Sequence, residues 1–155
     1  MNRVILTSKS LLTNFDLARY LEKMQIINLS GLYNVSPQIS LTDVEILSEK
    51  GFEKIICNRP DFEVHPNIQS SLIEKIATEI GISFEYHPLT FKNMNAENIV
   101  KQMAFIKESK RPILAYCTSG TRCAAIWALG QIGKMPKDEI LKKTRESGYN
   151  LEGLL

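Results

Sequence analysis

The sequence predicts an α/β fold of three layers, in which helices flank a mostly parallel central sheet. From about residue 26 onwards, short apolar runs typical of buried strands alternate with longer runs that have the apolar spacing of helices. Glycine or proline follows several of these runs, as at Gly51, Gly81 and Pro88, where a helix or strand is expected to stop. Strands joined by helices of this length need crossover connections, and such connections make the sheet mostly parallel.

Each expected element has a local sequence signal. The expected strands cover residues 32–35, 54–57, 83–87 and 112–116. The spacing of Ser40 and Asp43 is that of a capping box, so the first helix is expected after Ser40 and before Gly51. The later helices are expected over residues 68–80, from Asn95 or Ala96 to 109, from about 122 to 131, and from Pro136 to near Gly148.

The chain length indicates a single domain. Its 155 residues are enough for one domain with a proper core and too few for two of ordinary size. Residues 26–155 are expected to form this domain, and residues 1–25 an N-terminal extension that belongs to it. Residues 15–24 have helical spacing of apolar side chains, so this segment could pack on the domain or could mediate association.

The composition is that of a soluble globular protein, with 44% hydrophobic and 23% charged residues. No apolar run approaches the ~18 residues of a membrane span, and the apolar run at the N-terminus is too short for a signal-peptide core. The net charge of +2 is small and spread along the chain, which gives no support for nucleic-acid binding. Three cysteines are too few, and odd in number, for a secreted disulfide framework. We therefore expect a cytoplasmic protein without a membrane partner.

The most informative stretch is CTSGTR at residues 117–122, which joins the expected strand 112–116 directly to a helix. The backbone N–H groups of such a loop, the helix N-terminus and the Arg122 guanidinium all favour an anion. This environment lowers a thiol pKa and makes the thiolate of Cys117 the reactive species. The same loop, formed by Thr118, Ser119, Gly120, Thr121 and Arg122, could hold a phosphate or sulfate above the sulfur, with two of its oxygens bound by the guanidinium.

Cys117 could alternatively be a buried core residue, which is a common role of free cysteines. Three features favour the functional interpretation. Gly120 allows unusual backbone angles within the loop, and Ser119 and Thr121 add hydroxyl groups beside it. Arg122 lies where a helix should begin, and a cation there opposes the helix dipole. Arg122 therefore needs an anionic partner or another reason for its position.

Several separated segments carry a family resemblance. They are LYNVSPQ at residues 32–38, GF at 51–52 with IICNRPD at 55–61, YHP at 86–88, and AYCTSGTR at 115–122. In this order they resemble the bacterial phosphatase-like domain of beta-lactamase-hydrolase-like proteins, from about residue 27 to the mid-130s. The resemblance implies the fold of dual-specificity cysteine phosphatases, with the active loop between the last core strand and a helix. It also implies Cys117 as the nucleophile and Arg122 as the phosphate-binding arginine.

The loop length leaves a second activity open. Tyrosine and dual-specificity phosphatases carry five residues between the cysteine and the arginine, whereas this chain carries four, Thr118 to Thr121. Loops of this shorter kind look like those of rhodanese sulfurtransferases, which would work through a Cys117 persulfide. A domain that only binds an oxyanion, without catalysis, is the third possibility. The expected partner is accordingly a phosphorylated or sulfur-donating small molecule or protein.

The position of a general acid is a second open point. Dual-specificity phosphatases supply an aspartate from the loop that corresponds to residues 88–95, and this loop contains no carboxylate here. Asp61 is the better substitute, because it follows the end of a neighbouring parallel strand and could project towards Cys117. It could equally be a loop or cap aspartate that pairs with Arg59.

Other polar residues are expected near the site with weaker roles. Asn58, Arg59 and His87 are candidates for its rim, although a lone histidine is more often a hydrogen-bonded structural residue. Cys123 is a possible resolving cysteine for Cys117, with Cys57 as a second candidate, and both could instead be core residues. The histidines have no metal-ligand spacing with the cysteines, so neither a metal nor another cofactor is expected.

Overall fold

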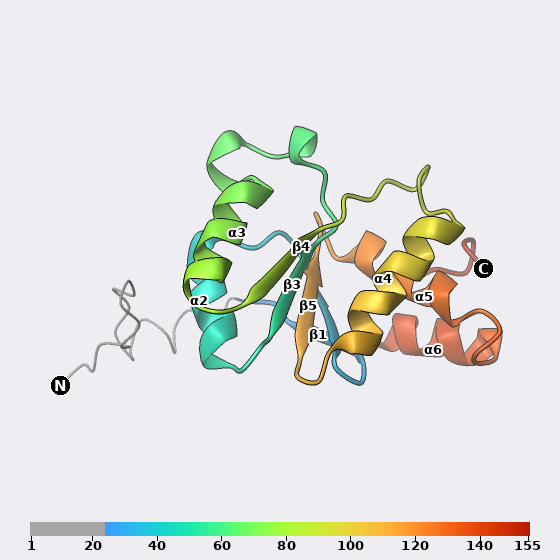
Figure 1. The fold of residues 1–155 in the computed structure, drawn as a ribbon. Helices are drawn as coiled ribbons and strands as arrows, with labels where there is room; N and C mark the ends of the chain where they lie inside the picture. Colours follow the sequence, from blue (N-terminus) through green and yellow to red (C-terminus); the bar gives the residue numbers. More distant parts are fainter. Residues whose placement is uncertain (1–23) are drawn as a thin grey trace.

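The computed structural model describes residues 24–155, and its centre is a five-stranded sheet with the strand order β1-β2-β5-β3-β4 (Figure 1). The strands are β1 (Ile27–Ser30), β2 (Tyr33–Ser36), β3 (Lys54–Cys57), β4 (Ser83–Tyr86) and β5 (Ile113–Tyr116). β2, β5, β3 and β4 are parallel neighbours, and only β1 runs antiparallel, beside β2. The predicted mostly parallel sheet is confirmed.

Helices cover both faces of the sheet, which confirms the predicted three layers (Figure 1). One side carries α2 (Leu41–Glu49) and α3 (Ser70–Glu79). The other side carries α4 (Ala96–Glu108), α5 (Thr121–Gln131) and α6 (Lys137–Glu146). Two 3₁₀ turns, η1 (Asp61–Glu63) and η2 (Pro66–Ile68), lie in the connection between β3 and α3.

Each face of the sheet has its own apolar core. Between the sheet and α2 and α3, the core includes Val44, Leu47 and Ile73, all fully buried. On the opposite face, α5 contributes a large part of the core, because seven of its eleven residues are buried. Cys117 and Cys123 belong to this second core, which also contains Tyr149 from beyond α6. The loop that carries Cys117 is therefore anchored by buried side chains on the helix that follows it.

The sequence signals correctly predict most element ends. The capping box at α2 is present: the Ser40 hydroxyl accepts from the Asp43 N–H (3.3 Å), and the Asp43 carboxylate accepts from the Ser40 N–H (2.8 Å). Gly51 follows α2 with a φ of 83°, a left-handed conformation that favours glycine.

Two parts of the fold differ from the expectation. β1 was not predicted; it forms a hairpin with β2 around Gly31, whose φ is 53°. α3 begins at Ser70 and not at residue 68, because Pro66–Ile68 forms the 3₁₀ turn η2 and Gln69 is extended. The prediction for residues 15–24 lies, except for Met24, outside the described part of the chain.

The topology brings the loop of residues 117–122 to the middle of one sheet edge. β5 lies between β2 and β3, and Cys117 directly follows its carboxyl end. The connections that leave the parallel strands β2, β3 and β4 start at the same edge, which is where ligands bind in sheets of this type. Within residues 24–155, no helix is both long and apolar enough to cross a membrane.

Candidate active site

Cys117 lies at the base of a tight loop between β5 and α5, and only 1% of the residue's surface is exposed. Its backbone N–H donates to the Ser36 carbonyl at the end of β2 (3.4 Å). Gly120 adopts a φ of 91° immediately before α5, and this turns the chain back over the sulfur. As a result, the Gly120 N–H donates to the Cys117 Sγ at 3.1 Å.

The surroundings of Cys117 favour its thiolate. A hydrogen bond from the Cys123 side chain is the largest cause, and together with the backbone N–H groups of Cys123, Arg122 and Gly120 it outweighs burial and lowers the pKa of Cys117 to about 5. Burial raises the pKa of Cys57 to about 11. Burial, and then the hydrogen bond to Cys117, raise the pKa of Cys123 well above its ordinary value. Of the three cysteines, only Cys117 therefore favours the thiolate at neutral pH.

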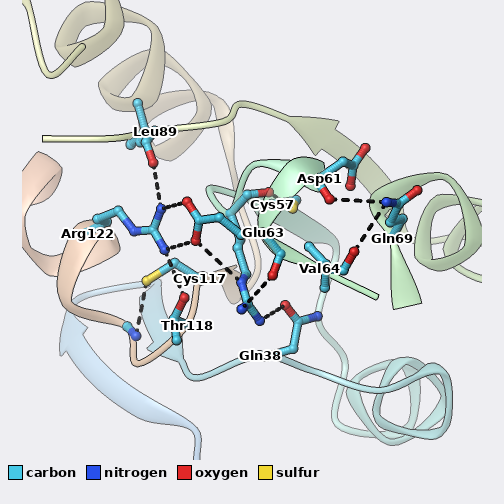
Figure 2. A network of polar contacts seen from close by, with 12 residues as sticks. Gln38, Cys57, Asp61, Glu63, Val64, Gln69, Leu89, Cys117, Thr118 and Arg122 are labelled. Atoms are coloured by element: carbon cyan, nitrogen blue, oxygen red, sulfur yellow. Dashed lines mark hydrogen bonds and ion pairs between the residues drawn. The ribbon is translucent and has the colours of Figure 1, made fainter. Parts of the chain in front are cut away.

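Arg122 is held from its far end by a carboxylate that the sequence analysis did not identify. Its Nη1 donates to the Glu63 Oε2 (2.8 Å) and to the Leu89 carbonyl (2.9 Å). Its Nη2 donates to the Glu63 Oε1 (2.8 Å) and to the Thr118 hydroxyl (2.9 Å). Figure 2 shows the guanidinium beside the Glu63 carboxylate, with Leu89 above it and with Cys117 and Thr118 below it. All four terminal N–H groups thus have acceptors.

This arrangement leaves the side edge of the guanidinium facing Cys117 (Figure 2). Because Glu63 occupies the end fork of Nη1 and Nη2, an oxyanion would have to contact the Nε–H and the Nη2–H that bonds the Thr118 hydroxyl. The bonds from Arg122 lower the pKa of Glu63 despite partial burial. Glu63, first, and also nearby Cys117 raise the pKa of Arg122. Glu63 is thus a carboxylate that stays ionised and keeps the guanidinium charged.

Glu63 is the anionic partner that the position of Arg122 requires. A cation at the start of a helix needs an anionic partner, and the partner of Arg122 is this carboxylate in η1, 59 positions earlier in the chain. The position of Arg122 at the start of a helix indicates such a partner but does not identify it. The irregular 3₁₀ backbone of residues 61–63 gave no periodic pattern from which to choose it.

Asp61, the predicted general acid, is engaged elsewhere. Its Oδ1 accepts from the Ser70 N–H (2.8 Å) and its Oδ2 accepts from the Ser70 hydroxyl (2.7 Å), so it caps the N-terminus of α3. Figure 2 shows Asp61 on the far side of Glu63 from Cys117. This placement corrects the expectation that Asp61 projects towards the sulfur.

Arg59 binds other partners than Asp61. It donates to the Gln38 Oε1 (3.1 Å) and to the Glu63 carbonyl (3.1 Å), and its Nε lies 3.6 Å from the Glu63 Oε1. The alternative of an Asp61–Arg59 pair is therefore not what the structure contains. Arg59 instead joins the loop after β2 to the turn that presents Glu63.

Asn58 and His87 lie beneath the site and not on its rim. Both are buried, and the Asn58 Nδ2 donates to the His87 carbonyl (2.8 Å). Gln102 of α4 bonds both side chains: its Oε1 lies 2.7 Å from the His87 Nδ1, and its Nε2 donates to the Asn58 Oδ1 (2.8 Å). The Asn58 carbonyl also accepts from the Leu89 N–H (2.9 Å). This network fixes the segment whose Leu89 carbonyl holds Arg122, and it corrects the expected rim position of both residues.

The remaining predicted residues have other contacts. The hydroxyls of Ser119 and Thr121 bond each other (2.8 Å) on the exposed side of the loop. Cys57 and Cys123 are free and buried, and the Cys57 Sγ donates to the Arg59 carbonyl (3.2 Å). In the described residues, no three His, Cys, Asp or Glu side chains are grouped so as to hold a metal ion.

Comparison with known sequences identifies the family. Residues 26–134 match the family described as the phosphatase-like domain of beta-lactamase hydrolase-like protein. A beta-lactamase hydrolase-like protein of Xylella fastidiosa is 25% identical over 131 residues, which are 83% of this chain and 30% of that protein. One from Agrobacterium fabrum has the same identity and coverage. The chain therefore spans about 30% of the length of the curated relatives it matches.

Solved structures agree with this match. A candidate phosphatase from Neisseria meningitidis is 32% identical and superposes with a TM-score of 0.74, over 83% of this chain and 92% of that chain. Kinase associated phosphatase, with its catalytic-site cysteine replaced by serine, has a TM-score of 0.66 at 15% identity, over 81% of this chain and 84% of its own. The core catalytic domain of a PP-IP phosphatase from S. cerevisiae has a TM-score of 0.61 at 16% identity, over 83% and 87%.

At their low identities, the last two similarities show the fold alone, which is that of the cysteine phosphatases, as predicted. The family match covers most of the domain and includes Cys117 and Arg122. The chain belongs to the family of phosphatase-like domains of beta-lactamase hydrolase-like proteins.

Proposed function

We propose that this phosphatase-like domain hydrolyses phosphate esters through a phosphocysteine intermediate at Cys117. The observation that carries the proposal is the thiolate itself: a sulfur with a pKa of about 5, held mainly by hydrogen bonds from the Cys123 side chain and from backbone N–H groups, at the carboxyl edge of a parallel sheet. The family to which the chain belongs is described as phosphatase-like, which supports a phosphate-containing substrate.

The proposed reaction has two steps. The Cys117 Sγ attacks phosphorus, the bond from phosphorus to the leaving oxygen breaks, and that oxygen departs with the electron pair. Water then attacks the phosphocysteine, the phosphorus–sulfur bond breaks, and the thiolate is restored as inorganic phosphate leaves. The loop N–H groups and the Nε edge of Arg122 stabilise the charge on the oxygens that remain on phosphorus.

The leaving oxygen must take its proton from solvent in this arrangement. Glu63 is ionised beside Arg122, and both oxygens of Asp61 accept hydrogen bonds from Ser70. A positioned acid contributes about 10²- to 10⁴-fold to such a reaction, so its absence slows the cleavage of poor leaving groups most. We therefore expect weak activity that favours activated aryl phosphates.

A sulfurtransferase is the second candidate, and the four-residue spacing between Cys117 and Arg122 is the observation that favours it. In this reaction, the thiolate attacks the outer sulfur of thiosulfate, the sulfur–sulfur bond breaks, and sulfite leaves with the electron pair. The resulting persulfide on Cys117 then passes its outer sulfur to cyanide or a thiol. Either activity needs a reduced Cys117, which agrees with a reducing, cytoplasmic location.

Two assays on one preparation separate these activities. The first measures phosphate release from an aryl phosphate, and the second measures thiocyanate formed from thiosulfate and cyanide. Cys117→Ser is the control in both assays. The phosphatase proposal predicts slow, vanadate-sensitive phosphate release that disappears in Cys117→Ser.

Other outcomes would overturn the proposal. Thiosulfate turnover far above phosphate release, with a mass increase of one sulfur on Cys117, would establish the sulfurtransferase. If neither activity occurs while an oxyanion still protects Cys117 from alkylation, the domain is an oxyanion-binding module.

A further inference from the structure

The C-terminal segment places a tyrosine hydroxyl against the outer side of the Cys117 loop. α6 ends at Glu146, and Gly148 follows with a φ of 94°, its N–H donating to the Arg145 carbonyl (2.9 Å). The next N–H, that of Tyr149, donates to the Thr144 carbonyl (2.8 Å). These two hydrogen bonds turn the chain sharply back towards α5 after the end of α6. The Tyr149 ring is therefore packed into the same core as Cys117.

Tyr149 bonds the peptide unit that reaches the sulfur. The Tyr149 hydroxyl donates to the Ser119 carbonyl (3.1 Å), and the Gly120 N–H donates to the Cys117 Sγ (3.1 Å). The Ser119 carbonyl and the Gly120 N–H are the two ends of one planar, trans peptide group. A donor fixed at the carbonyl end therefore sets the direction of the N–H at the other end. It also polarises that peptide group, which strengthens its bond to the thiolate.

The close approach of Tyr149 also depends on the glycine at this position. A Cβ atom on residue 120 would collide with the Tyr149 hydroxyl, and the positive φ of Gly120 disfavours any other residue independently. Gly120 and Tyr149 thus fit one another, although Tyr149 lies outside residues 26–134, where the family match ends.

We propose that Tyr149 is a positioning residue of the active site, which aims the Gly120 N–H at the Cys117 thiolate and at an oxyanion bound above it. This inference rests on the proposed role of Cys117, and it makes α6 and the segment after it part of the functional domain. Burial raises the pKa of Tyr149 to about 12, so its hydroxyl stays a donor throughout the range in which Cys117 ionises.

The test is the pH profile of Cys117 alkylation in Tyr149→Phe, which removes only the hydroxyl. We expect the midpoint of this profile to rise by about half a pH unit or more, and the dissociation constant for vanadate to rise about threefold or more, the size of one weakened hydrogen bond. Tyr86→Phe is the matched control, because the Tyr86 hydroxyl accepts from the Asp61 N–H (3.0 Å), away from the loop. It should change neither value.

Two further readouts keep the test independent of catalysis and of folding. In the amide NMR spectrum of Tyr149→Phe, the Gly120 signal should shift and exchange faster, while the signals of β3 and β5 stay in place. An unchanged alkylation midpoint and vanadate affinity in a folded Tyr149→Phe would overturn the inference. An ordinary thiol midpoint in the wild-type protein would instead refute the proposed role of Cys117.

Discussion

Glu63 fixes the orientation of the Arg122 guanidinium. Because both carboxylate oxygens hold the end of the guanidinium, its side edge remains directed at the loop that contains Cys117 (Figure 2). The carboxylate also adds negative charge near the site, which by itself would oppose an oxyanion. The geometry favours the positioning role, because charge-assisted bonds of this type are stronger than ordinary hydrogen bonds.

Glu63→Gln tests whether the positioning of Arg122 by Glu63 outweighs the repulsion between this carboxylate and an oxyanion. The amide keeps one acceptor for Arg122 and loses the charge, so we expect the guanidinium to move and vanadate to bind about tenfold more weakly, the loss of one charge-assisted bond. Isothermal titration of vanadate measures this change, with Glu97→Gln on the exposed start of α4 as the control. Tighter binding in Glu63→Gln would show that the carboxylate competes with the oxyanion.

Asp61→Asn should affect stability and not chemistry. Its carboxylate caps α3 through Ser70, and the loss of a helix cap costs about 1 kcal/mol of unfolding free energy. Denaturant unfolding measures this cost. Rates with aryl phosphates of good and poor leaving groups should stay equal to those of the wild-type protein. A rate loss confined to the poor leaving groups would restore the acid role of Asp61.

At the scale of elements, the junction of β5 and α5 determines the site. Gly120→Ala should lower the free energy of unfolding by about 1–3 kcal/mol, because alanine is strained in the left-handed conformation of this position. The loss should be larger still, because the new methyl group displaces the Tyr149 hydroxyl. We also expect vanadate binding to be lost. Gly133→Ala is a matched control: its φ of 83° is similar, and an added methyl group there meets nothing within 4 Å.

The two glycine variants separate backbone strain from loop geometry. Thermal unfolding should show a loss in both, whereas vanadate binding should fail only in Gly120→Ala. Normal vanadate affinity in a folded Gly120→Ala would contradict the assigned role of this junction.

How well the sequence predicts an element depends on whether its signals are local. Regular elements with caps were predicted well, because apolar spacing and residues such as Ser40 and Gly51 act locally. β1 was missed because its four residues carry little apolar pattern and depend on pairing with β2. Cys117 and Arg122 could be predicted as site residues because both lie in one short loop, residues 117–122. Glu63 was missed because its contact is between residues distant in the chain.

At the scale of the whole molecule, the thiolate links the site to folding stability. The pKa of Cys117 is about 5 in the folded protein, mainly because of the Cys123 hydrogen bond, whereas an unfolded cysteine has a pKa of about 8.5. Between these values the unfolded chain binds one more proton than the native protein. Stability therefore rises with pH in this window, and the contribution is lost as the pH falls towards 5.

Cys117→Ser should remove this dependence, because serine does not ionise. We expect the stability difference, wild type minus Cys117→Ser, to grow by at most about 1.4 kcal/mol per pH unit across the window. Urea unfolding at several pH values measures it. A difference that stays constant with pH would mean that folding does not favour the thiolate.

The most direct test of the account is the reactivity of Cys117 itself. Iodoacetamide alkylation of the wild-type protein, followed by peptide mass spectrometry at each pH, gives a separate profile for each cysteine. We predict that Cys117 reacts first, with a midpoint near its pKa of about 5, which is set mainly by the Cys123 hydrogen bond, and that phosphate or vanadate slows its reaction. Equal labelling of Cys57, Cys117 and Cys123 with midpoints near about 8.5, and no protection by oxyanions, would contradict the account.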